Sequence, residues 1–182
     1  MRQLIFLIPV PLMSIHTMAQ DLQIYRRNVA RDMPKPASSK TIIDALQTTV
    51  YDLIGPQQNN QQLRWNVVRS IFYAIYERLG ELYKKVAGYI GLVVERDRAL
   101  GAPVDGCPPA VTANSKLSEM LYKKMRDADG IEMQSAAFKT KSNRVYARIE
   151  ATEKDDPVTA SMLQKVAHDI DKQLCMLRAH QQ

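Results

Sequence analysis

The chain has 182 residues, of which 46% are hydrophobic and 24% charged, a balance typical of one globular domain with its own core. Only 7 glycines and 3 phenylalanines argue against a turn-rich all-β fold. The formal net charge of +6 at pH 7 has two interpretations. It is either a solvated basic surface or a surface for an acidic partner, such as nucleic acid or an anionic membrane.

The two cysteines, Cys107 and Cys175, are too far apart in sequence for a metal-binding pair and too few for a disulfide framework. We expect two isolated thiols in the core or in loops. A single bridge is the alternative if the protein is exported.

The N-terminus has the layout of a secretory signal. Arg2 precedes an apolar run over residues 4–13, and Thr17-Met18-Ala19 resembles a cleavage site. The alternative is that translation starts at Met18. We predict a cytoplasmic protein, and a periplasmic one if residues 1–19 are a cleaved signal peptide.

Residues 20–40 are polar and contain Pro34 and Pro36. Such a segment has little apolar surface to bury, so we expect a flexible basic tail. Its cations are candidates for DNA binding: Arg26, Arg27, Arg31, Lys35 and Lys40.

Apolar residues at helical spacing predict a first helix from residue 41. Gly55-Pro56 should disturb this helix, because proline lacks the amide hydrogen and clashes with the preceding turn. The polar stretch over residues 57–62 is then either a solvated helix face or a loop.

The strongest periodicity predicts a second helix over residues 70–99. It contains Gly80, Gly88 and Gly91, each costing about 1 kcal/mol relative to alanine, so we expect close helix approach at these positions.

Glycine and proline residues over 100–113 predict a crossover loop, followed by a short helix over residues 115–124. A third long helix is expected over residues 127–152. Asp155-Asp156-Pro157 reads as a turn and N-cap that start the last helix. Four long helices with one long crossover predict an all-α, ferritin-like four-helix bundle over residues 41–182, with a short extra helix between helices 2 and 3.

Metal and catalytic motifs are weak. His16, His168 and His180 are isolated, and no Glu-x-x-His pair of the kind that di-iron bundles use occurs in the sequence. No Gly-rich phosphate loop or nucleophile elbow occurs either.

Three segments resemble the Dps family of mini-ferritins. Residues 63–67 read Leu-Arg-Trp-Asn-Val, where the family has a histidine before Trp-Asn-Val. Residues 95–101, Glu-Arg-Asp-Arg-Ala-Leu-Gly, are similar to the end of the family's second helix. Residues 171–180 resemble its last helix, with Cys175 where the family usually has Trp. The resemblance runs from residue 41 to residue 180.

The resemblance implies a ferroxidase centre between two subunits related by a twofold axis. The family's ligands are a histidine, a second histidine 12 residues on, and carboxylates 16, 27 and 31 residues from the first; counting from Arg64 gives Tyr76, Gly80, Gly91 and Glu95. Only Glu95 keeps a ligand side chain, and a guanidinium offers no lone pair. We therefore expect a degenerate centre without ferroxidase activity or a bound cofactor, although iron could bind elsewhere.

We expect Arg64 to form an inter-subunit salt bridge with Glu95 of a neighbouring subunit. The alternative is a pair of unrelated solvated charges.

The resemblance also implies a hollow homododecamer that protects DNA by consuming iron or by coating the DNA. With the first route impaired, DNA binding through the basic tail is the main hypothesis. The alternatives are an iron-handling cage that uses candidate pore residues Asp155 and Asp156, and a structural oligomer in the periplasm. A mixed cage with a paralogous subunit also stays open.

Overall fold

The computed structural model describes residues 20, 23–24, 39–68, 71–116 and 123–179. The chain separates into two units, Met1–Pro34 and Lys35–Gln182, and the second contains the bundle. The leader and four cations of the predicted tail lie outside the described residues: Arg26, Arg27, Arg31 and Lys35. His16 and His180 also lie outside them.

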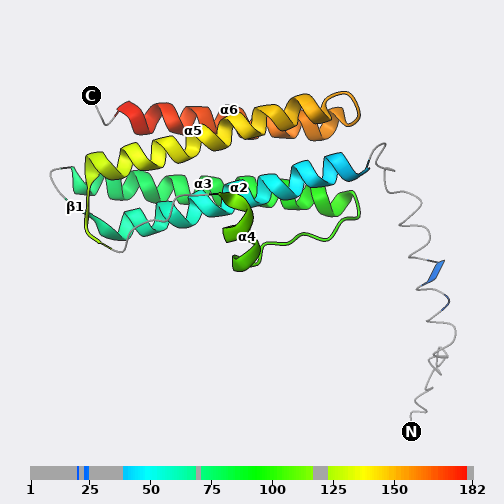
Figure 1. Ribbon diagram of the computed structural model, residues 1–182, viewed down its shortest axis with the longest axis horizontal. Coiled ribbons are helices and arrows are strands. Elements are labelled where there is room, and N and C mark those ends of the chain that lie inside the picture. The colour runs from blue at the N-terminus through cyan, green and yellow to red at the C-terminus, as the bar shows by residue number, and fades with distance from the viewer. Residues whose placement is uncertain (1–19, 21–22, 25–38, 69–70, 117–122, 180–182) are drawn as a thin grey trace, which may run out of the picture. The chain divides into compact units, whose positions relative to one another are not determined.

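Four long helices form the bundle: α2 (Ser39–Asn66), α3 (Phe72–Ala99), α5 (Asp127–Thr152) and α6 (Pro157–Arg178). Helix α2 lies along α3 and α5 along α6, and the two hairpins face each other (Figure 1). The crossover between them carries α4 (Pro108–Ser115), which rests on α2. This arrangement confirms the predicted four-helix bundle. No helix in the described part of the chain is long and apolar enough to cross a membrane.

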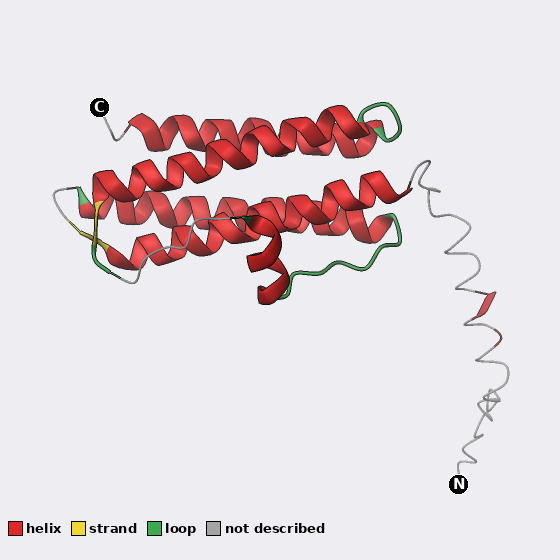
Figure 2. Ribbon diagram, viewed as in Figure 1, coloured by secondary structure: helices red, strands yellow, loops and turns green. Residues whose placement is uncertain are grey.

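A short parallel strand pair joins the two hairpins at one end of the bundle. β1 (Val67–Val68) follows α2 directly, and β2 (Met125–Arg126) precedes α5 (Figure 2). The pairing places the end of α2 beside the start of α5, where the crossover returns to the bundle.

The core is formed by apolar side chains that recur at three- and four-residue spacing on the inward faces of the helices. Fully buried examples are Leu46 and Leu53 of α2; Ile75, Leu79, Leu82, Val86 and Val93 of α3; Ile131 and Phe138 of α5; and Val166 and Ile170 of α6.

Helix α2 continues through Pro56, so the expected interruption at Gly55-Pro56 does not end it, and the polar stretch is not a loop. The side chain of Gln57 donates to the Tyr83 carbonyl at 3.3 Å, and Asn60 donates to the Leu79 carbonyl at 2.6 Å. Gln134 of α5 donates to the Pro56 carbonyl at 3.1 Å. These tertiary hydrogen bonds offset the one that proline removes.

The short crossover helix lies earlier than predicted. It occupies Pro108–Ser115, inside the stretch expected to be a loop. Its two prolines stand in the first turn, where the missing amide hydrogen costs no helical bond. The helix ends before Lys116, whose φ of 49° is left-handed, so the prediction of a helix over residues 115–124 is wrong at its start. Residues 117–122 lie outside the described part.

Only one of the three α3 glycines meets a close neighbour within the subunit. A Cβ added at Gly80 would lie 3.1 Å from Arg64 Nε, whereas one at Gly88 or Gly91 would meet nothing within 4 Å. Close approach inside the described subunit therefore explains Gly80 alone.

Both cysteines are exposed and free, so neither is a core thiol and they do not form a bridge. Cys107 immediately precedes α4, and Cys175 lies on the outer side of α6.

Candidate functional site

The Arg64 side chain is held against α3 by two contacts with one residue. Arg64 stands in the last turn of α2, and its Nε donates to the Tyr76 carbonyl at 3.1 Å. Its guanidinium carbon also lies 3.9 Å from the centroid of the Tyr76 ring, a cation–π geometry. The Tyr76 ring in turn packs on Phe72, with 5.5 Å between ring centroids. Arg64 is therefore fixed by its own subunit.

Gly80 leaves the space that this guanidinium occupies. A Cβ there would lie 3.1–3.2 Å from Nε, Cζ and Nη2 of Arg64, closer than side chains normally pack. The structure thus brings together Arg64, Tyr76 and Gly80, the first three of the five positions singled out in the sequence. The Arg64 guanidinium, which is always cationic, fills the space between these three positions.

The other two positions, Gly91 and Glu95, lie farther along the same helix. At about 1.5 Å per residue, Glu95 is roughly 22 Å from Gly80 along α3. Glu95 is exposed. Arg64 therefore cannot meet Glu95 of its own subunit, and their pairing across two subunits stays a prediction.

Within one subunit, Arg64, Tyr76 and Gly80 offer an iron ion only the Tyr76 phenol oxygen as a side-chain ligand. Arg64 has no lone pair to donate, and Gly80 has no side chain. The Tyr76 carbonyl already accepts the Arg64 hydrogen bond. Over the whole described part, no three His, Cys, Asp or Glu residues are grouped so that they could hold a metal ion. His168 is an exposed residue of α6.

Asp156, one of the candidate pore residues, is engaged within its own subunit. It caps α6 by accepting from the Thr159 amide at 3.1 Å, and its two oxygens accept from Arg96 Nη2 at 2.9 and 2.7 Å. Burial alone would raise the pKa of this carboxyl, but the hydrogen bonds from Thr159 and Arg96 lower it below its ordinary value. Its role in the described fold is to start α6, while its neighbour Asp155 is exposed.

A buried charge cluster was missed in the sequence. Asp52 of α2 is fully buried and contacts three cations of α5: Lys141, Arg144 and Arg148. The spacing of these cations places them on one face of α5, and this was the available signal. Asp52 stands within the apolar stripe of α2, so its burial was also predictable, but its partners were not.

A second buried carboxylate, Asp97 of α3, was also missed. It has no exposed surface, and neither of its oxygens has a hydrogen-bond partner among the described residues. Burial raises the pKa of Asp97 to about 6.

Comparisons with known proteins agree with this architecture. The family described as a ferritin-like domain matches residues 43–182. DNA protection during starvation protein 2 of Deinococcus radiodurans is 33% identical over 140 residues, which are 77% of this chain but only 58% of that protein. The DNA protection during starvation protein of Brevibacillus brevis is 30% identical over 150 residues, covering 74% of this chain and 98% of the relative. The crystal structure of Dps92 from Deinococcus radiodurans has a TM-score of 0.75 at 33% identity, and the match covers 77% of this chain and 85% of that one.

Proposed function

Because this chain belongs to the Dps family of ferritin-like proteins, we propose that it forms a cage whose inherited metal position takes no iron and that it protects DNA by binding it. The relatives matched above are named for DNA protection during starvation. The match spans 58% of the Deinococcus radiodurans relative, so the activity of that whole protein is carried over here as part of the proposal.

The Arg64 guanidinium carries the first half of the proposal. It stacks on Tyr76 and fills the space above Gly80, so a divalent cation at this place would face a fixed positive charge. Like charges a few ångströms apart and partly removed from water repel by several kcal/mol, on the order of the binding energy of a weak metal site. Oxidation of Fe²⁺ by this centre should therefore be absent.

The same guanidinium supports a role in self-association. Its hydrogen bond to Tyr76 uses Nε, while end-on pairing with a carboxylate uses the two terminal nitrogens. Glu95 of a neighbouring subunit is the carboxylate that the family's twofold arrangement would supply. A homododecamer is the assembly we propose, with a paralogous subunit as an alternative partner.

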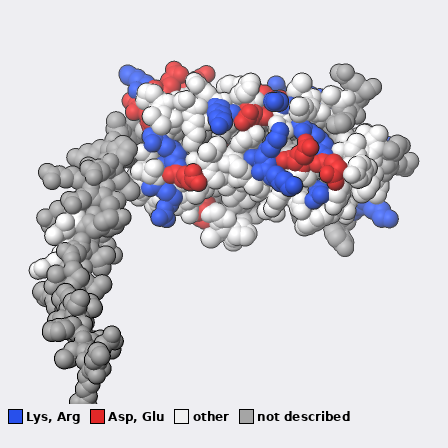
Figure 3. Space-filling model, turned by 180° about the vertical axis from the view of Figure 1, so that it is seen from behind, with Lys and Arg blue, Asp and Glu red and all other residues white. Residues whose placement is uncertain are grey.

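The basic tail supports the second half of the proposal, that the protein binds DNA. On the face of the bundle drawn in Figure 3, Lys and Arg are interspersed with Asp and Glu, so that face offers no broad surface of one sign. Residues 20–40, by contrast, carry 5 cations and 2 acidic residues, Asp21 and Asp32. Lys40, the described cation of this stretch, is exposed in the first turn of α2. Repeated over a cage, such tails would bind phosphates without sequence preference.

The first half of the proposal, that the inherited position takes no iron, is tested by measuring Fe²⁺ oxidation. The purified, metal-stripped protein is compared with a protein-free control, with oxygen and with peroxide as oxidants. We expect rates equal to the control. A variant with Arg64→His, Tyr76→His, Gly80→Asp and Gly91→Asp should gain saturable oxidation, and adding Glu95→Gln to it should remove that gain. Saturable oxidation by the unchanged protein would contradict the proposal and favour an iron-handling cage.

DNA binding is tested by titrating duplex DNA with the full chain at several salt concentrations. Arg26→Gln, Arg27→Gln, Arg31→Gln and Lys35→Gln together should weaken binding and reduce the salt slope by up to about 4. The matched control neutralises four exposed bundle cations: Lys84, Lys85, Lys139 and Lys165. Equal losses in both variants would show that the tail has no special role. A mature N-terminus at Gln20 would favour export and the structural-oligomer alternative.

A further inference from the structure

The charge cluster around Asp52 contains more cations than anions. Its carboxylate, 1% exposed, lies 3.0 Å from Lys141 Nζ, 2.7 Å from Arg144 Nη1 and 2.5 Å from Arg148 Nη2. A second acceptor is the carbonyl of Ser115, the last residue of α4, which bonds to Lys141 and lies 3.5 Å from Arg144 Nη1. The carbonyl end of a helix carries about half a negative charge, and less for a helix this short. The described acceptors therefore leave at least one positive charge unbalanced.

This imbalance is costly because two of the cations are removed from water. The side chains of Lys141 and Arg148 are 1% and 12% exposed. Burial lowers the pKa of the Lys141 ammonium, the contacts with Asp52 raise it in part, and the nearby Arg144 and Arg148 lower it again. Buried charges normally occur with full compensation, so one more anion would stabilise the cluster.

The cluster can be reached from one side. Arg144 is its most accessible member, with a side chain that is 32% exposed. Lys116, which follows Ser115 in the left-handed conformation, is also exposed, and the Ser115 carbonyl lies 3.5 Å from Arg144 Nη1. A small anion can therefore reach Arg144 from solvent, and the helix bundle need not open.

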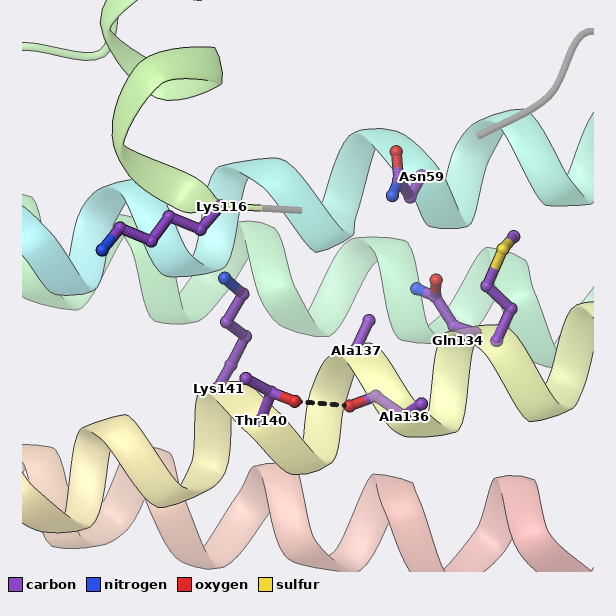
Figure 4. A pocket seen from close by; sticks show the side chains of 8 residues that line it. Asn59, Lys116, Gln134, Ala136, Ala137, Thr140 and Lys141 are labelled. Carbon is purple, nitrogen blue, oxygen red and sulfur yellow. Dashed lines mark hydrogen bonds between the residues drawn. The ribbon is translucent and has the colours of Figure 1, made fainter. Parts of the chain in front are cut away.

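A cavity of about 180 Å³ adjoins these lysines between α2 and α5. A water molecule takes up about 30 Å³ in the liquid, so this cavity has room for a small oxyanion and some water. In Figure 4, Lys116 comes from the end of α4 and Lys141 from α5, and both ammonium groups lie at the end of the pocket away from Gln134. The described lining residues are neutral or cationic: Asn59, Lys116, Met133, Gln134, Ala136, Ala137, Thr140 and Lys141. Arg144 does not line the cavity itself; it lies one turn of α5 beyond Lys141, with Nη1 3.5 Å from the carbonyl of Ser115, the residue before Lys116.

We propose that the C-terminal end of α4 and the facing turns of α5 form a binding site for a small tetrahedral oxyanion of the phosphate class. Arg144, Lys141 and Lys116 contact the anion, Asp52 holds the first two in place, and Arg148 pairs with Asp52. A guanidinium beside ammonium groups matches the geometry and charge of such an anion. The depth of Lys141 excludes the backbone of a nucleic acid, so the ligand is a free oxyanion. The site lies where the end of α4 meets α5, beside α2, and it does not depend on the function proposed above.

Calorimetric titration of the full-length protein with inorganic phosphate, in buffer free of phosphate and sulfate, tests the site. We expect one saturable site per chain. Arg144→Gln should weaken the affinity at least tenfold, and Lys139→Gln, at an exposed position of the same helix, should leave it unchanged. If Arg144→Gln disturbs folding, as judged by circular dichroism, Lys116→Gln replaces it, with an expected loss of about threefold. The absence of saturable binding, or equal affinity in the wild type and the Arg144 or Lys116 variant, would overturn the proposal.

A single-stranded oligonucleotide without terminal phosphates identifies the source of the anion. The affinity of the oligonucleotide should be the same for the wild type and for Arg144→Gln. Because the oligonucleotide should not enter the site, 10 mM phosphate should change its affinity equally in the two proteins. If Arg144→Gln weakens the oligonucleotide as much as it weakens phosphate, the site takes backbone phosphates and the assignment to a free oxyanion is wrong.

Discussion

Replacing Asp97 by asparagine should stabilise the protein at neutral pH and do so less in acid. The buried Asp97 carboxyl has a pKa of about 6, whereas its ordinary value is 3.8. A raised carboxyl pKa means that ionisation favours the unfolded chain, so stability is greatest below the ordinary value and is lost as pH rises from there through 6. Since each tenfold change in proton affinity is worth about 1.4 kcal/mol, the ionised group costs up to about 3 kcal/mol at pH 7.5 and about 1 kcal/mol at pH 4.5. Screening by nearby solvent reduces both figures, so we expect a difference of about 1–2 kcal/mol between the two pH values.

Urea unfolding at equal protein concentration measures this difference for the wild type and Asp97→Asn at pH 4.5 and 7.5. The cost of burying the amide does not depend on pH, so it cancels when the two pH values are compared. Glu77→Gln is the matched control, because it removes an exposed carboxylate from the same helix. A stability gap between wild type and Asp97→Asn that is equal at both pH values would refute the reasoning, since the carboxyl would then titrate alike in the folded and unfolded chains.

Three further substitutions have expected outcomes. Asp52→Asn should cost about 3–5 kcal/mol in urea unfolding, because it leaves buried cations without their carboxylate; a loss below about 1 kcal/mol would mean that water compensates them. Asp156→Ala should lower the free energy of unfolding by about 1–2 kcal/mol, because the cap of α6 and the contact with Arg96 are lost. Since the pKa of Asp156 is lowered, the difference in stability from the wild type should shrink as pH falls below 4, which unfolding at pH 3 and 7 checks. Gly130→Ala should lower the melting temperature, because its Cβ would collide with a leucine side chain of α2, whereas Gly88→Ala has open space and should not; equal melting temperatures would contradict this packing.

The sequence by itself determined most of the helices. The third long helix was predicted over residues 127–152 and occupies Asp127–Thr152, and the last begins at Pro157 after its cap Asp156. These features depend on local interactions: a capping side chain, a proline whose ring fits the first turn, and an apolar stripe at helical spacing. The same periodicity was enough to predict the bundle and its long crossover. The five positions from Arg64 to Glu95 were assigned by counting the family's ligand spacing from Arg64, so their role depends on the resemblance and stays a prediction.

Only the tertiary structure decided the features that depend on other helices. The continuation of α2 through Pro56 depends on hydrogen bonds from Asn60 to α3 and from Gln134, none of which are visible in local propensity. The position of α4 depends on the surface of α2 on which it rests, and the stacking of Arg64 on Tyr76 depends on the space above Gly80. The cations around Asp52 come from a helix about 90 residues away in sequence, and no local pattern encodes which charges meet when two helices pack.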